Sequence, residues 1–426
     1  MNELQRIQPP LFPVESVEIP EAAMHTLKNG VPVFLIESGT EDIMRLEFTF
    51  KAGQAREYIP LLASATNMML SEGSQNYSSE ELNRQLDFYG TFLHLDCDRD
   101  RSEIVLFFLN KHIEKILELS REIVFRPAFP DPELNTLMKK RQRWHQVNRE
   151  KVNKLADDQF FESVFGKNHP YGYKILEKDY ENLNTSMLAE YHQRYYTTDN
   201  MAVIVSGKIH DQTIDLLNKY FGETVINRHY NSDNEHNIKG NTEKRVFINK
   251  DNSIQTAIRI GSSTINKMHP DYPGLKILDT ILGGYFGSRL MKNIREDKGY
   301  TYGINSSVSS LNLAGYKMIS TEVGKDNYRK ALDEIYNEIR ILQNKPINNE
   351  ELNLVRNYMS GEMVRMFDGP FALAESFKSV WEFGLGNEYY HRLAEKIRII
   401  EPDEITQLAR TYYNIDDLYE VSAGSK

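Results

Sequence analysis

The sequence predicts an α+β fold made of two homologous units, each a largely antiparallel sheet with helices packed on one face. Two observations lead to this prediction. The same order of expected strands and helices occurs in residues 1–227 and again in residues 246–426. The strands also come mainly in adjacent pairs instead of alternating strictly with helices. A polar stretch at 228–245 fits a linker between the two units.

The first unit opens with a hairpin turn at Asn29-Gly30, a pair suited to a type I′ turn. Ser78 and Glu81 have the spacing of a capping box, and Gly90 ends the helix that they open. Alternating apolar and polar residues then indicate a strand and its hairpin partner. We expect strands at 44–51, 91–97 and 103–109, and helices at 60–71, 79–89 and 111–124.

The second unit repeats this order. Gly283-Gly284 separates two expected helices, Gly299 ends the second of them, and Pro346 breaks the chain before a further helix that begins at Asn348. We expect strands at 255–260, 300–309 and 315–322, and helices at 273–282, 288–298 and 328–342.

Composition limits the classes of function. A formal net charge of −10 argues against a nucleic-acid partner, because no basic face rises above the mixed background. The single cysteine, Cys97, excludes an internal disulfide framework and suits a reducing compartment. The longest apolar run, 104–109, is far too short to span a membrane, and the first residues show no signal-peptide pattern. We therefore expect a cytoplasmic protein.

The window 61–74, LLASATNMMLSEGS, is the most informative segment of the chain. Its apolar residues form one stripe of a helix that ends at Gly73: Leu61, Leu62, Ala65, Met68 and Met69. In its surroundings the window resembles the insulinase/pitrilysin family of zinc peptidases, the inverzincins. Their signature is His-x-x-Glu-His on this helix, followed by a Gly-Thr or Gly-Ser step. The step is present here as Gly73-Ser74, but the signature is absent.

The alignment on Gly73-Ser74 shows what replaces the signature. Ser64 and Met68 stand where the two histidine ligands would be, and Asn67 stands where the general-base glutamate would be. Serine and methionine are poor zinc ligands, and asparagine cannot take a proton from water. The family's third ligand, a glutamate, would fall near 143–145, where there is no acid. No two of the eleven histidines are spaced i, i+4, which excludes a helical histidine pair. We therefore assign no metal ligand in this chain, and only a site assembled by the fold from distant residues stays open.

Two weaker signals have simpler explanations. The glycines of LGGYFGSRL (282–290) precede a helix, but the Gly-Lys-Ser/Thr ending of a nucleotide phosphate loop is missing, so a tight turn with close packing is favoured. His145 lies near the third-ligand position, yet a lone histidine on a charged helix is normally solvated or salt-bridged.

The resemblance covers nearly the whole chain. It implies a half-clamshell of two homologous units, two of which close on a chamber that holds a peptide. The segments that carry it, in order, are LKNG (27–30), the Gly53 region, FRPAFPDPE (125–133), HPYG (169–172), DNMAVIVSG (199–207), LGGYFGSRL (282–290) and IREDKGYTYGI (294–304).

The last of these segments keeps its chemistry. In the family, an arginine and a tyrosine seven residues later point into the chamber, and these positions match Arg295 and Tyr302. A guanidinium and a phenol can stabilise the negative charge that peptide hydrolysis builds on the scissile carbonyl oxygen. Without the family pattern, Arg295 would be interpreted as a solvated charge near a helix end, and Tyr302 as a packing residue of a strand.

The sequence thus predicts a non-catalytic, substrate-binding subunit of a two-chain zinc endopeptidase, which is not a peptidase on its own. A zinc-bearing homologous partner would supply the metal, and this chain would close the peptide chamber and donate Arg295 and Tyr302. One alternative is a peptide-binding or scaffold homodimer without protease activity. A second is an active zinc peptidase with an unrecognised metal site.

Overall fold

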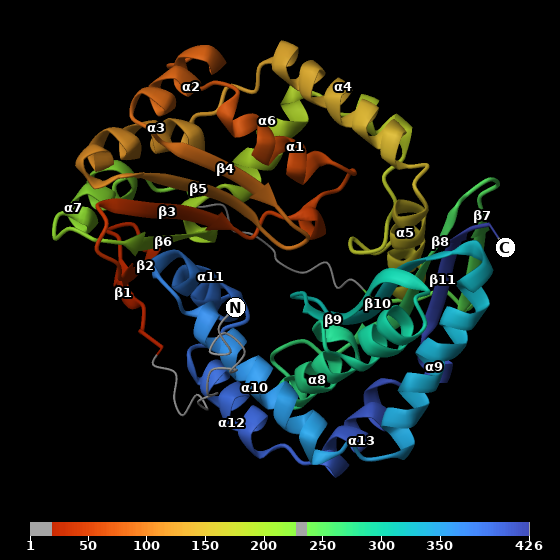
Figure 1. Cartoon of the computed structure of the whole chain (residues 1–426). Coiled ribbons are helices and arrows are strands. Elements are labelled where there is room, and N and C mark those ends of the chain that lie inside the picture. The colour runs from red at the N-terminus through yellow and green to blue at the C-terminus, as the bar shows by residue number, and fades with distance from the viewer. Residues whose placement is uncertain (1–18, 227–236, 426) are drawn as a thin grey trace, which may run out of the picture.

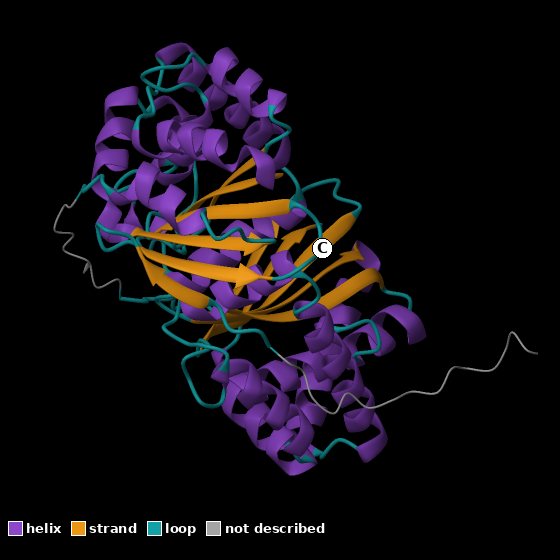
Figure 2. Ribbon diagram, turned by 90° about the vertical axis from the view of Figure 1, so that its left-hand side faces the viewer, coloured by secondary structure: helices purple, strands orange, loops and turns teal. Residues whose placement is uncertain are grey.

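The computed structural model describes residues 19–226 and 237–425 (Figure 1). It contains two mixed sheets surrounded by helices, with the strands in the middle of the molecule and helices gathered at both ends (Figure 2). This arrangement confirms the predicted α+β fold. Residues 227–236 of the predicted linker lie outside the described residues. The boundaries of the two units therefore stay a prediction.

The first sheet has the strand order β1-β2-β6-β3-β5-β4. All its neighbouring strands are antiparallel except β2 and β6, which are parallel. Its strands are β1 (Ala23–Thr26), β2 (Pro32–Glu37), β3 (Ile43–Phe50), β4 (Phe92–Cys97), β5 (Ser102–Leu109) and β6 (Met201–Gly207).

The second sheet, in the order β7-β11-β8-β10-β9, repeats this plan. Its one parallel pair, β7 with β11, corresponds to β2 with β6. The antiparallel pairs β11–β8, β8–β10 and β10–β9 then correspond to β6–β3, β3–β5 and β5–β4. This correspondence confirms the two homologous units. The strands are β7 (Arg245–Asn249), β8 (Gln255–Thr264), β9 (Thr301–Ser310), β10 (Gly315–Gly324) and β11 (Tyr419–Gly424).

The helices follow a similar order in the two described units, with α3 to α6 between β5 and β6 and α9 to α13 between β10 and β11. Ser78 and Glu81 form the predicted capping box of α2. Three short segments of the described residues are wound as π-helix: Asn218–Gly222, Thr280–Gly284 and Met291–Asp297. The first unit holds α1 (Leu62–Met68), α2 (Ser79–Phe88), α3 (Ile113–Phe125), α4 (Asp131–Asn148), α5 (Val152–Phe165), α6 (Thr185–Tyr195) and α7 (Thr213–Leu217). The second holds α8 (Tyr272–Asp279), α9 (Tyr328–Asn344), α10 (Asn349–Met366), α11 (Pro370–Trp381), α12 (Glu388–Ile399) and α13 (Pro402–Tyr412).

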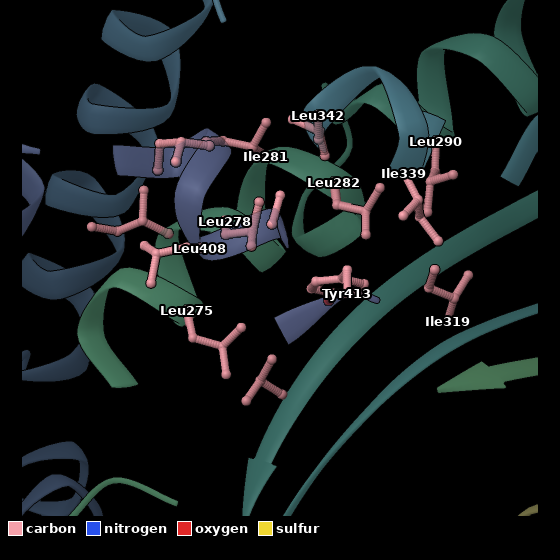
Figure 3. Packing of buried hydrophobic residues seen from close by; sticks show 14 of the residues in the cluster. Leu275, Leu278, Ile281, Leu282, Leu290, Ile319, Ile339, Leu342, Leu408 and Tyr413 are labelled. Carbon is pink, nitrogen blue, oxygen red and sulfur yellow. The ribbon is translucent and has the colours of Figure 1, made fainter. Parts of the chain in front are cut away.

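Each sheet packs one face against the helices of its own unit. In the second unit this packing forms one large apolar core, in which side chains of α8, α9 and α13 meet those of β10 (Figure 3). Gly283 lies at the edge of this core, where an added Cβ would come within 2.6 Å of the backbone nitrogen of Ser306. The glycines of 282–290 therefore serve close packing here, as the sequence indicated.

The opposite face of each sheet is covered by one helix from the other unit. Helix α5 of the first unit packs on β8 and β11, with Ala156 and Val164 buried against the second sheet. Asp157 on this helix accepts a hydrogen bond of 2.6 Å from Arg259 of β8. Helix α11 of the second unit lies in turn on β2 and β6. The two helices hold equivalent places in their units, so the exchange is reciprocal.

The contact between α11 and the first sheet contains a buried group of charges. Arg45 and Glu47, on the same face of β3, are almost fully buried and form an ion pair. Lys378 of α11 places its Nζ 2.9 Å from a carboxylate oxygen of Glu47 and 2.7 Å from one of Glu103. Burial and the neighbouring Glu47 raise the pKa of Glu103 to about 8. Lys378 is therefore the cation that compensates two desolvated carboxylates at once.

No helix in the described part of the chain is both long and apolar enough to cross a membrane.

We predict that Lys378→Met lowers the free energy of unfolding by about 3–5 kcal/mol, because the substitution leaves a buried carboxylate without its cation. Lys219→Met is the matched control, since Lys219 pairs with Glu114 on the exposed surface and should change little. Urea unfolding of both variants checks the prediction. Equal, small effects would mean that α11 docks without help from the buried charges.

Candidate functional site

Helix α1, the predicted metal-binding helix, is buried beside α6 and the β4–β5 hairpin. The backbone N–H groups at its start have no partner inside the helix, as at any helix start. The carboxylate of Glu57 accepts hydrogen bonds from the backbone N–H groups of Leu61, at 3.3 Å, and Ala63, at 2.8 Å. The hydroxyl of Tyr173 donates to the same carboxylate. Burial raises the pKa of Glu57 to about 7.

The three residues that replace the zinc signature lie on this helix. Two of them, Ser64 and Asn67, make hydrogen bonds within the fold. Ser64 is buried and its hydroxyl donates to the carbonyl oxygen of Leu61 at 3.2 Å. Asn67 is fully buried, and its side-chain amide donates to the Glu103 carbonyl at 3.2 Å and to the Tyr196 hydroxyl at 3.3 Å. These contacts hold the helix in place and provide no group able to activate water.

A cation lies beside Ser64, the residue that replaces the first histidine ligand. Arg141 of α4 donates from Nη2 to the Ser64 hydroxyl at 2.9 Å. Its Nη1 is buried and has no hydrogen-bond partner within the described residues. A guanidinium keeps its positive charge and would repel a metal ion. The residues present therefore do not fit zinc.

Neither the third-ligand region nor any other described part of the chain supplies a metal site. Trp144 is exposed, whereas His145 is buried and packs 5.4 Å from the ring of Tyr180. The expectation that His145 is solvated or salt-bridged was wrong, because the α4 face that carries it turns inward. Burial lowers its pKa. Within residues 19–226 and 237–425, no group of three or more His, Cys, Asp or Glu side chains could hold a metal ion.

A cavity of about 780 Å³ opens beside the eroded site. Met68, at the second histidine position, lines it and is 40% exposed. The cavity combines cationic with aromatic and apolar side chains, and its volume falls within the usual range for small-ligand pockets. Sequence reasoning missed this cavity, because its lining comes from α1, α4, α5 and the loop that follows α5. Its other lining residues are Gln54, Arg99, Leu137, Lys140, Arg141, Trp144, His145, Lys154, Asp157, Asp158, Phe161, Pro170, Tyr171, Tyr173, Ile175 and Tyr180.

Arg295 and Tyr302 lie in the second unit. Arg295 is in the π-helical segment Met291–Asp297, and its guanidinium lies 4.7 Å from the ring centre of Phe286, which is itself exposed. Tyr302 is 91% exposed near the start of β9, the edge strand of its sheet. An exposed tyrosine of this kind is not a packing residue. Their roles stay a prediction.

Comparison with known proteins finds a family profile that matches part of the chain. The profile described as "Peptidase M16 inactive domain" matches residues 182–359. "Uncharacterized zinc protease YmxG" of Bacillus subtilis is 23% identical over 80% of this chain and 83% of its own length. "Probable inactive metalloprotease YmfF" of the same organism is 21% identical over 81% of this chain and 85% of its own length. "Mitochondrial-processing peptidase subunit alpha-1" of Dictyostelium discoideum is 24% identical over 48% of this chain and 32% of its own length.

Solved structures give the same fold. A protease from Helicobacter pylori superposes with a TM-score of 0.85 at 17% identity, covering 95% of this chain and 100% of that one. A peptidase M16 inactive domain from Pseudomonas fluorescens has a TM-score of 0.81 at 20% identity, covering 95% of this chain and 98% of that one.

We predict that Glu57 makes folding stability depend on pH. Its pKa is about 7 in the folded protein, against an ordinary 4.5, so the folded state binds the extra proton between these values. The stability that this proton contributes is complete below pH 4.5 and is lost as pH rises to 7. The stability of the wild type relative to Glu57→Gln should therefore fall by on the order of 3 kcal/mol across this window.

Urea unfolding at a series of pH values measures this difference, with the exposed Glu190 changed to Gln as the control. Parallel curves for wild type and Glu57→Gln would contradict the prediction.

Proposed function

This chain is related to the M16 zinc peptidases but lacks their zinc signature, and we propose that it is the non-catalytic, substrate-binding subunit of a two-chain zinc endopeptidase. The observation that carries the proposal is the contact between Arg141 and Ser64. It places a cation against the residue that replaces the first histidine ligand, and the surrounding helix and sheet are retained. A zinc-bearing homologue would supply the metal and the general base.

The positions of the half-buried Arg295 and the exposed Tyr302 support a role toward such a partner. The two side chains lie on the π-helical segment and on the strand that follows it. Single-turn π segments interrupt regular helix geometry and occur often at functional sites. A guanidinium and a phenol presented this way can donate hydrogen bonds to an oxyanion at a neighbouring chain's zinc.

Two free sheet edges support peptide binding. β4 is the last strand of the first sheet and β9 the last strand of the second. An edge strand has backbone N–H and C=O groups that an extended peptide can pair with, so recognition would depend little on peptide sequence. We propose that the substrate adds as a strand to one of these edges.

A peptide-binding or scaffold homodimer remains the second candidate, because it explains the loss of the zinc signature equally well. The two candidates differ in what they need: the heterodimer requires a zinc-bearing homologue, whereas the homodimer requires only a second copy of this chain. The similarity of this chain to the Dictyostelium discoideum protein named mitochondrial-processing peptidase subunit alpha-1 favours the heterodimer.

We predict that Arg295→Ala and Tyr302→Phe each lower kcat of the assembled two-chain enzyme by about 10²–10³-fold, which is the usual effect of removing one oxyanion donor. Assembly with the zinc-bearing homologue should be unchanged. Lys292→Ala is the matched control, since Lys292 is exposed on the same helical segment. Unchanged kcat in both test variants would remove the proposed roles.

We also predict that the purified chain takes up no stoichiometric zinc. This chain and the zinc-bearing homologue are each incubated with zinc and passed through gel filtration. Elemental analysis should then find bound zinc only in the homologue. One zinc per molecule of this chain alone would revive the alternative of an active peptidase with an unrecognised site.

A further inference from the structure

We propose that the cavity beside α1 binds a free carboxylate attached to an apolar or aromatic body, and that its source is the C-terminal residue of a bound peptide. This inference rests on the proposed peptide-binding function and adds the part of the peptide that is recognised. Three features of the cavity support it: the charged side chains of its lining, the aromatic side chains of its lining, and its position beside β4.

The cavity has more cations than anions. Of its two acidic residues, Asp157 is paired with Arg259 and Asp158 with Lys154. Arg99, Lys140 and Arg141 also line the cavity, and none of the three has a carboxylate within ion-pair distance in the described part of the chain. A partly buried guanidinium without a counter-ion is unfavourable, so an incoming anion would be stabilised there.

Arg141 provides the geometry for a carboxylate. Its Nη2 is fixed by Ser64, while Nη1 has no partner within the described residues. The nearby Glu57 forms no ion pair with Arg141 within the described residues, and its carboxyl accepts hydrogen bonds from Tyr173 and two backbone N–H groups. The planar guanidinium can pair with a carboxylate in a way that a lysine cannot.

Aromatic side chains supply the apolar part of the site. The Arg99 guanidinium lies 4.0 Å from the ring centre of Phe161, and both side chains line the cavity. This contact holds a second cation at the cavity. Trp144, which is 62% exposed, and the buried Tyr180 also line the cavity. Such walls favour a ligand with an aromatic or aliphatic side chain over a small inorganic anion.

The position of the cavity connects it with the proposed peptide strand. β4, a free sheet edge, ends at Cys97, and Arg99 is only two residues further on. α1, which also lines the cavity, packs on β4. A peptide that lies parallel to β4 along this edge would therefore bring its C-terminal end to the cavity.

The test is fluorescence anisotropy of the purified chain with a labelled extended peptide that ends in phenylalanine, made as the free acid and as the C-terminal amide. We expect the acid to bind about tenfold or more tightly than the amide, as for a hydrogen-bonded charge pair. Arg141→Gln should abolish this preference. Arg143→Gln, an exposed arginine of the same helix, is the matched control and should preserve it.

Thermal unfolding shows whether each variant is folded, and Arg141→Lys, which keeps the charge, should retain a reduced preference. Equal binding of acid and amide to the wild type, or a preference that survives in Arg141→Gln, would overturn the inference and leave the proposed function standing. Absence of any peptide binding would overturn both. N-acetylphenylalanine that competes as strongly as the whole peptide would show a small-acid site and overturn the peptide as the source.

Discussion

The reciprocal exchange of α5 and α11 is the constraint on which the rest of the structure depends. Each unit builds a sheet with two faces to cover but packs its own helices on one of them. Part of the other face is covered by a single helix from the opposite unit (Figure 1). Neither sheet is complete without the other unit. The edge strands and the cavity are thereby held in one body, with α5 contributing at once to the cavity and to the second sheet.

The eroded helix is stabilised by contacts that exclude its former chemistry. Asn67 is buried against β5 and Tyr196, and Ser64 accepts a hydrogen bond from Arg141. Ser64 and Asn67 both hydrogen-bond to other parts of the fold, so the site is rebuilt and not simply emptied. The arginine that excludes a metal ion is also the side chain best placed to attract an anion. Loss of zinc binding and gain of a carboxylate site are, in this account, two effects of one residue.

The sequence was sufficient for the plan of the fold but not for its long-range contacts. Local signals such as the capping box at Ser78 and Glu81 located elements well, because capping depends on neighbouring residues. Periodicity could not predict which sheet α5 or α11 would cover, since an apolar stripe does not identify its partner. Arg45 and Glu47 in β3 would be expected to face solvent, and only α11 explains their burial. The Arg141–Ser64 contact joins residues 77 positions apart and has no local signal.

The central claim is a division of labour, in which this chain shapes and holds the peptide while another chain carries the metal. Native mass spectrometry of the chain, captured by an affinity tag at its natural level from the cells that make it, tests this claim most directly. The account predicts a one-to-one complex with a homologue that contains His-x-x-Glu-His and one bound zinc. A homodimer of this chain without zinc, and without any such homologue, would contradict it.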